Sequence, residues 1–265
     1  MTSTAIVTGA SRGLGRGIAA ALAAAGQRTI MVARDPQVLA VAADEIDRTS
    51  PGGVVETEAL DVADEAAVLR LVQRAGPIDV VVNAAGALPV LELPDALSWK
   101  EWRRPIDVDV RGVFNVVRAA APRLGEGATV VNVASGAVVA GTPLHASYSA
   151  GQAALLTLSR SLGAWLAPRG IATHSLSPSL TLEGAAGRLG ATVFGAASGK
   201  TAEEWFAARF GSEMLTPEMT GAAVVDLQSE RTGGDWVLGT FGLHRWSPLT
   251  APEVTDWAGP RIAVG

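Results

Sequence analysis

The stretch Thr8-Gly9-Ala10-Ser11-Arg12-Gly13-Leu14-Gly15 decides the fold. It follows a β-rich run, Thr4–Thr8, and it precedes apolar residues at helical spacing that end at Gly26. Small residues in such a turn let backbone amides approach a pyrophosphate, and the N-terminus of the following helix favours negative charge. A turn of this kind at the first strand-to-helix junction predicts dinucleotide binding. The residues expected at the nucleotide are Gly9, Ser11, Arg12, Gly13, Leu14 and Gly15.

The rest of the chain alternates short β-rich runs with alanine-rich helical stretches. After the first strand, further strands are expected at residues 29–33, 54–60, 78–83, 129–133, 171–176 and 236–239. Helices are expected after the glycine turn and at roughly residues 64–75, 105–124, 147–167 and 217–229. Several strands are apolar throughout, which is typical of a sheet covered on both faces. The pattern predicts one α/β domain over residues 1–265, a Rossmann-type doubly wound fold with about seven parallel strands.

Two regions depart from this alternation. Residues 179–200 are the least regular stretch, rich in Gly, Ala and Ser, and they precede a short helix that the capping-box pair Thr201 and Glu204 opens. We interpret residues 179–212 as a substrate lid, with an ordinary surface loop as the alternative. Residues 241–265 form a C-terminal extension.

Composition excludes several classes of function. The 265 residues contain no cysteine, which excludes zinc–cysteine sites, iron–sulfur clusters and thiol catalysis, and we expect no metal site. The 21 basic and 26 acidic residues argue against a nucleic-acid surface. Apolar stretches are too short to span a membrane. The first residues run straight into a strand, so we expect no signal peptide and a cytoplasmic protein.

The spacing Gly-x-x-x-Gly-x-Gly resembles the short-chain dehydrogenase/reductase family, and further motifs extend the resemblance over residues 4–240. Asp61-Val62 resembles the family's adenine-contacting pair. Asn83-Ala84-Ala85-Gly86 resembles its Asn-Asn-Ala-Gly turn, with Ala84 replacing the second Asn. Pro178 stands where the family has Pro-Gly, although Ser179 replaces the glycine. The resemblance implies a nicotinamide cofactor that contacts Asp61, Val62, Asn83, Ala84, Gly86 and Pro178.

Basic residues near the second strand favour NADP(H) over NAD(H). NAD-specific enzymes of this fold place an acid at the end of that strand, where this chain has Ala33 followed by Arg34. Arg12 lies inside the glycine turn, and two guanidinium groups can pair with a 2′-phosphate. Asp35 argues the other way, but it comes one residue later than the usual acid. The alternative is that both arginines are solvated surface charges.

The resemblance also implies a catalytic Tyr that acts as acid or base on the substrate oxygen and a Ser that polarises this oxygen. It further implies a Lys four residues after the Tyr, which lowers the pKa of the Tyr and holds the nicotinamide ribose. An Asn on an earlier helix positions that Lys through water. Tyr148, the one tyrosine of the chain, and Ser135 match the first two positions. We expect them to be catalytic.

The other two positions depart from the family. Gln152 replaces the Lys, and Asp109 replaces the Asn in the stretch from Val108 to Phe114. Gln152 can hydrogen-bond a ribose hydroxyl, but without a charge the Tyr148 phenol loses its main reason to titrate below about 10. A nearby Asp109 raises the Tyr148 pKa further. We expect ketone reduction, which needs only the phenol, to suffer less than alcohol oxidation, which needs phenolate.

His145 lies one turn before Tyr148, and we include it among the candidate catalytic residues because His can serve as acid or base near pH 7. The alternative is a loop histidine with a structural role. Ser135, His145 and Asp109 also supply the residue types of a hydrolytic triad, although no Gly-x-Ser-x-Gly elbow surrounds Ser135.

Three interpretations follow. The first is an NADP(H)-dependent oxidoreductase that uses Tyr148 and Ser135 on a small molecule. The second is a redox-neutral enzyme that catalyses a cyclisation, dehydration or isomerisation, with Ser135, Tyr148, His145 or Asp109 as acid and base. The third is a catalytically silent subunit in a heteromer with an active relative. Apolar residues of the lid region favour a bulky, mostly apolar ketone or alcohol. Small and apolar residues on the helices at 105–124 and 147–167 favour a homodimer or homotetramer.

Overall fold

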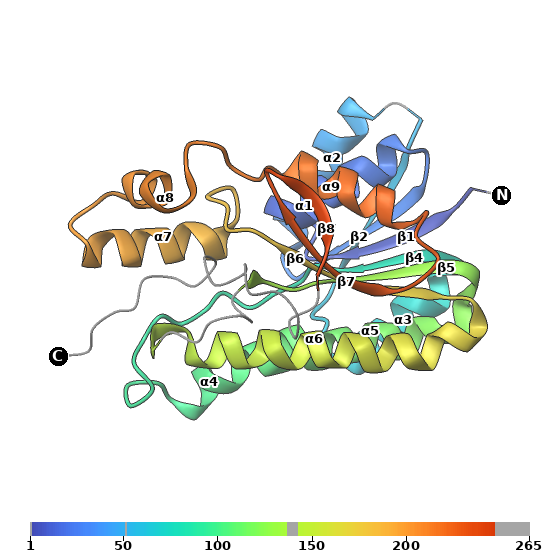
Figure 1. The fold of residues 1–265 in the computed structure, drawn as a ribbon. Helices are drawn as coiled ribbons and strands as arrows, with labels where there is room; N and C mark the ends of the chain where they lie inside the picture. The colour runs from blue at the N-terminus through green and yellow to red at the C-terminus, as the bar shows by residue number, and fades with distance from the viewer. Residues whose placement is uncertain (1, 51, 137–142, 247–265) are drawn as a thin grey trace.

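The computed structural model describes residues 2–50, 52–136 and 143–246 and is built on one eight-stranded sheet (Figure 1). The strand order is β3-β2-β1-β4-β5-β6-β7-β8. The seven parallel strands are β1 (Thr4–Thr8), β2 (Arg28–Ala33), β3 (Val54–Ala59), β4 (Ile78–Asn83), β5 (Leu124–Val133), β6 (Ala172–Pro178) and β7 (Gly234–Gly239). β8 (Gly242–Arg245) pairs with β7 in the antiparallel sense. The Rossmann-type fold is confirmed, and the predicted C-terminal extension begins with this eighth strand; its residues 247–265 lie outside the described part of the chain.

Helices cover both faces of the sheet, as Figure 1 shows. On one face lie α1 (Gly13–Ala24), α2 (Pro36–Thr49) and α9 (Pro217–Leu227); on the other lie α3 (Glu65–Ala75), α5 (Val113–Ala120) and α6 (Ala146–Leu166). Successive strand residues point to opposite faces. Ile6 of β1 therefore packs in the core below α3, α5 and α6, whereas Val7 packs in the core below α1, α2 and α9. Two buried faces explain the apolar strands.

The glycine turn closes tightly onto α1. Gly9 has a φ of +70°, a conformation that side-chain-bearing residues rarely adopt. A Cβ on Gly15 would lie 2.3 Å from the carbonyl oxygen of Gly9. These two glycines are therefore required by the backbone packing of the turn itself, which places the first turn of α1 at the end of β1.

The helix predicted at residues 105–124 is a composite of several segments, so this prediction was wrong in detail. The chain forms α4 (Trp99–Pro105), a π-helical segment (Ile106–Gly112), α5 and a 3₁₀ turn (Ala121–Arg123), after which β5 begins earlier than predicted. Gly112 ends the π-helical segment at a close contact, because a Cβ there would lie 2.6 Å from the Val62 side chain. Wider helical turns of this kind often occur at functional sites.

The irregular stretch predicted at residues 179–200 contains a helix, α7 (Ala185–Ala197), and this is a correction. Two of its glycines allow close contact with neighbouring backbone. A Cβ on Gly187 would lie 2.1 Å from the backbone carbonyl oxygen of Thr181, and a Cβ on Gly195 would lie 2.8 Å from the backbone carbonyl oxygen of Thr201. The capping-box helix that follows is confirmed as α8 (Ala202–Phe210). Two further helices were not anticipated: α2, which Asp35 caps, and α4, which Ser98 caps.

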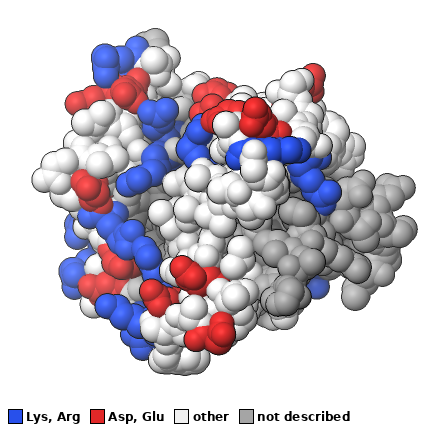
Figure 2. Space-filling view, turned by 90° about the vertical axis from the view of Figure 1, so that its left-hand side faces the viewer, with Lys and Arg blue, Asp and Glu red and all other residues white. Residues whose placement is uncertain are grey.

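Charges of both signs share the surface on the side of α7 and α8. Figure 2 shows Lys and Arg side chains alternating there with Asp and Glu around a broad area of other residues. Within the described ranges, no helix is long and apolar enough to cross a membrane.

Candidate active site

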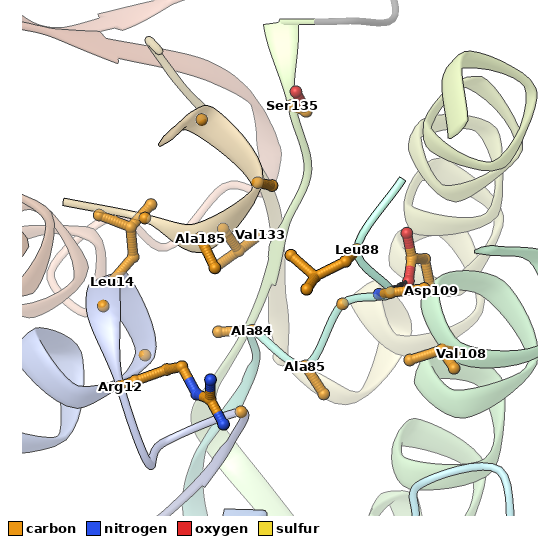
Figure 3. Close-up of a pocket in the computed structure, with 18 of the residues that line it drawn as sticks. Arg12, Leu14, Ala84, Ala85, Leu88, Val108, Asp109, Val133, Ser135 and Ala185 are labelled. Atoms are coloured by element: carbon orange, nitrogen blue, oxygen red, sulfur yellow. Dashed lines mark hydrogen bonds between the residues drawn. The ribbon is translucent and has the colours of Figure 1, made fainter. Parts of the chain in front are cut away.

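A cavity of about 880 Å³ lies at the carboxyl ends of β1, β4, β5 and β6, where ligands bind in open α/β sheets. Figure 3 shows the glycine turn with Arg12 on one side of this cavity and Asp109 on the other, with Ser135 at the end of β5. The structure brings nearly all the predicted site residues to its wall: Gly9, Ser11, Arg12, Gly13, Leu14, Gly15, Arg34, Asp61, Val62, Ala84, Gly86, Asp109, Ser135, His145, Tyr148, Gln152 and Pro178.

Asn83 is the predicted site residue that does not line the cavity. It is buried in the sheet, where its side-chain amide donates to Oδ1 of Asn132 at 2.8 Å. Asn132 in turn donates to the Ser159 hydroxyl at 3.0 Å. Asn83 therefore ties β4 to β5 and α6 behind the cavity.

Thr8 is a supporting residue that sequence reasoning missed. Its hydroxyl oxygen accepts hydrogen bonds from the backbone N–H groups of Ala84 at 3.2 Å and Ala85 at 3.1 Å. These bonds hold the turn after β4 against the glycine turn after β1. A hydroxyl residue as the last residue of the strand, directly before Gly9, was the available signal.

The two arginines predicted at the nucleotide are free to bind an anion. Arg12 and Arg34 line the cavity, and neither guanidinium group forms an ion pair or hydrogen bond with a described residue. By contrast, Arg16 on the same helix turn pairs with Glu45 at 2.6 Å. The Asp35 carboxylate caps α2 by accepting the backbone N–H groups of residues 37 and 38. The Asp35 carboxylate is therefore already hydrogen-bonded within the protein.

Two hydrogen bonds fix the turn after β3, one within the turn and one from α5. The Asp61 carboxylate accepts the backbone N–H of Ala63 at 2.9 Å, and the Val62 carbonyl accepts the Asn115 side-chain amide at 3.1 Å. Asn115 belongs to α5, so this bond fixes the cavity wall at residues 61 and 62 to the helix layer. The predicted adenine-side pair is thus a rigid part of the wall.

Ser135 and Tyr148 come together from different elements. Ser135 follows β5, Tyr148 lies in the first turn of α6, and the two side chains are hydrogen-bonded. Burial raises the pKa of Tyr148 to about 12, the nearby Asp109 raises it as well, and the Ser135 hydrogen bond opposes them. The direction is the one that the missing lysine predicts, and the neutral phenol is the form present at physiological pH.

Asp109 is buried in the π-helical segment, with 1% of its surface exposed. One carboxylate oxygen, Oδ1, accepts the backbone N–H of Ala87 at 2.7 Å, and Oδ2 accepts the Gln152 side-chain amide at 2.8 Å. Burial raises the pKa of Asp109 to about 7, although these two bonds and the Arg104 charge act against the shift. The cavity therefore contains a carboxyl group that titrates near neutrality.

His145 reaches the cavity, in a 3₁₀ turn (Pro143–His145) before α6. Its ring makes edge contacts with Tyr148 and with Phe194, at centroid distances of 5.9 and 5.3 Å, and burial lowers its pKa. Its Nε2 atom is buried and has no hydrogen-bond partner in the described part of the chain. Asp109 accepts from Ala87 and Gln152, and no hydrogen bond joins it to His145 in the described part of the chain, so the three residue types of a triad are not assembled as one.

Part of the cavity wall is apolar and aromatic. Phe194 of α7 stacks on Trp205 of α8 at 5.6 Å, and Trp205 meets Phe210 at 5.9 Å. All three line the cavity. The helices of the region interpreted as a lid thus contribute an apolar, aromatic part of the cavity wall.

The residues present fit a phosphorylated dinucleotide. The glycine turn offers backbone amides at a helix N-terminus, and the guanidinium groups of Arg12 and Arg34 have no protein partner among the described residues. Oε1 of Gln152 is a buried acceptor that also lacks a described partner. Such an acceptor costs about 1–3 kcal/mol while it is unpaired.

Comparison with known proteins identifies the family of this chain. Residues 3–192 match the family described as short chain dehydrogenase. The chain is 32% identical over 183 residues to a 3-oxoacyl-(acyl-carrier-protein) reductase of Staphylococcus aureus, covering 67% of this chain and 74% of the relative. It is 33% identical over 184 residues to a 2-dehydro-3-deoxy-L-rhamnonate dehydrogenase (NAD(+)) of a Sphingomonas species, covering 66% and 70%. The chain therefore belongs to the short-chain dehydrogenase family, and it is an enzyme of the oxidoreductase class.

Solved structures show the same fold. A short chain dehydrogenase from Burkholderia cenocepacia in complex with NADP superposes with a TM-score of 0.73 at 26% identity, covering 88% of this chain and 95% of that one. An actinorhodin polyketide ketoreductase variant with NADPH gives 0.77 at 26% identity and the same coverage. The relatives thus include proteins named with either nicotinamide nucleotide.

Proposed function

We propose that this enzyme is an NADP(H)-dependent reductase of a bulky, mostly apolar ketone. The hydrogen-bonded pair Ser135 and Tyr148 carries the proposal, because it lies in one cavity with the glycine turn and two arginines that have no described partner. Arg12 and Arg34 would hold the 2′-phosphate, and the turn would hold the pyrophosphate. The aromatic wall of α7 and α8 would hold the apolar body of the substrate.

The site residues divide the chemistry between them. The bound nicotinamide supplies or accepts a hydride. Ser135 donates a hydrogen bond to the substrate oxygen and polarises it, and Tyr148 transfers its phenolic proton to this oxygen as the alcohol forms. With a Tyr148 pKa of about 12, phenolate is on the order of one part in 10⁵ at pH 7. The neutral phenol, which is the form that ketone reduction requires, is therefore the populated form.

The test is a single-enzyme assay of apolar aryl and alkyl ketones with NADPH, following nicotinamide absorbance and product mass together. We expect alcohol to appear as absorbance falls. Tyr148→Phe should lower turnover by about 100-fold or more, since the general acid is lost, while NADP(H) affinity stays the same. A Tyr148→Phe variant with full activity would contradict the assignment.

The carboxyl group of Asp109 favours one alternative. Its pKa of about 7 and its place on the cavity wall suit an acid or base in a redox-neutral step, and His145 lines the same cavity. The same assay separates the two functions. A redox-neutral reaction would form product while the nicotinamide absorbance stays flat, and Asp109→Asn would then abolish product formation.

A further inference from the structure

The helical stretch that runs through α4 and the π-helical segment presents arginines on two different faces. On one face Arg103 and Arg111 both pair with Asp107, at nitrogen–oxygen distances of 3.3 and 3.6 Å. Arg104 lies on another face, because it lines the cavity together with Val108, about one helical turn further along. Arg104 is therefore part of the cavity wall, whereas its two arginine neighbours are not.

The Arg104 guanidinium has no partner in the described part of the chain: it forms neither an ion pair nor a hydrogen bond there. The nearby acid, Asp109, is 1% exposed, and its two oxygens already accept hydrogen bonds from Ala87 and Gln152. The Arg104 charge nevertheless acts on Asp109, where it opposes the rise in pKa that burial causes. The guanidinium thus lies near the Asp109 side of the cavity, with its own hydrogen-bond donors unused by the protein.

Arg104 stands apart from the arginines expected at the nucleotide. Figure 3 shows Arg12 beside the glycine turn, with Val108 and Asp109 on the opposite side of the cavity. Leu88 is drawn on the Asp109 side, so the surroundings there are partly apolar. A charge pair is stronger beside apolar groups than in open water. A nucleotide phosphate at the glycine turn therefore leaves a second cation, across the cavity, for another ligand.

We propose that Arg104 is a specificity-determining residue, which binds an anionic group of the substrate, a carboxylate or a phosphate. This proposal rests on the reductase function proposed above, and it narrows the substrate class to ketones with an apolar body and one anionic end. The aromatic side chains of α7 and α8 would hold the apolar body. A guanidinium presents five N–H donors in a planar fork, so it can form two parallel hydrogen bonds with such an anion.

The experiment compares phenyl-substituted keto acids with their primary amides at saturating NADPH. The carbon chain between the ketone and the carboxylate is varied in length, and a third set has a phosphonate in place of the carboxylate. An amide and a carboxylate are nearly equal in shape, but only the carboxylate is charged. The best anionic ketone should have a kcat/KM about tenfold or more above that of its amide, the worth of a hydrogen bond to a charged group. Added salt should reduce this ratio.

Variants of Arg104 assign the preference to this residue. Arg104→Gln should bring the ratio of anion to amide close to one. Arg104→Lys should keep part of the ratio, because the charge remains while the planar fork is lost. Arg103→Gln is the matched control: Arg103 is the preceding residue on α4, but it pairs with Asp107 away from the cavity wall, so the ratio should stay unchanged.

The outcomes separate this proposal from the proposed function. If ketones are reduced with no preference for the anionic compounds, or if the preference survives intact in Arg104→Gln, the role of Arg104 is overturned while the reductase function stands. If no ketone is reduced, the reductase function fails, and calorimetry with the same acids and amides decides the anion site alone. Tighter binding of the acids that Arg104→Gln abolishes supports the site, and equal binding of acids and amides overturns it. The comparison of acid with amide in the unmodified enzyme needs no variant to fold.

Discussion

Asp109 places a carboxyl group inside the protein where a neutral amide would fit the same two hydrogen-bond partners. Burial makes its charged form unfavourable and raises its pKa from the ordinary 3.8 to about 7 in the folded enzyme. Between these pH values the folded state holds more protons at this residue than the unfolded state. The contribution of Asp109 to stability is therefore fully present below pH 3.8 and is lost as the pH rises to about 7.

Asp109→Asn should remove this pH dependence. The free energy of unfolding of the variant, relative to the unmodified enzyme, should rise by up to about 1.4 kcal/mol per pH unit between roughly pH 4 and 7. Urea unfolding across this range measures the difference. Asp107→Asn is the matched control, because Asp107 lies in the same segment but is partly exposed and near Arg103 and Arg111. A stability difference that is constant with pH would contradict the buried, protonated carboxyl.

At the scale of elements, two strand-to-helix turns bring Arg12 and Arg34 to one side of the cavity. We expect NADP⁺ to bind more tightly than NAD⁺, because the 2′-phosphate can pair with both guanidinium groups. Replacing both arginines by Ala should reduce the preference by roughly 30-fold or more, measured as the ratio of the two dissociation constants. Arg16→Ala, which breaks only the surface pair with Glu45, should leave the ratio unchanged. Equal affinity of the unmodified enzyme for both nucleotides would refute the assignment.

Sequence patterns over a few residues predicted the strands and the tight turns, because the conformation of these elements depends mainly on neighbouring residues. Apolar runs and the glycine turn identified the seven parallel strands, and all the predicted site residues except Asn83 line the cavity, because strand ends and tight turns are encoded within a few residues. The helix α7 was missed because Gly187 and Gly195 signal a loop, while in the fold they allow close packing. The Asp109–Gln152 bond joins residues 43 positions apart, and no local signal could show that the two departures from the family face each other.

At the scale of the whole molecule, the helix layer of α5 and α6 leaves large apolar side chains at the surface. Phe114 is 40% exposed and Trp165 is 50% exposed, while their helices already bury other faces against the sheet. Arg118 lies over the Phe114 ring at 5.2 Å, which leaves the ring on the outside of the layer. Exposed aromatic rings on neighbouring helices are typical of a surface that another subunit covers.

We therefore expect a dimer or tetramer in which this layer meets its copy, since most soluble oligomers pair identical surfaces. Light scattering at micromolar concentration should give at least twice the 27.1 kDa of the chain. Trp165→Glu should shift the population to smaller species, because a charge would be buried at the contact. Val41→Glu, at a 59% exposed position of α2 on the opposite face of the sheet, should leave the mass unchanged. A monomer at this concentration would refute the expected assembly, and an equal effect of both variants would place the contact elsewhere.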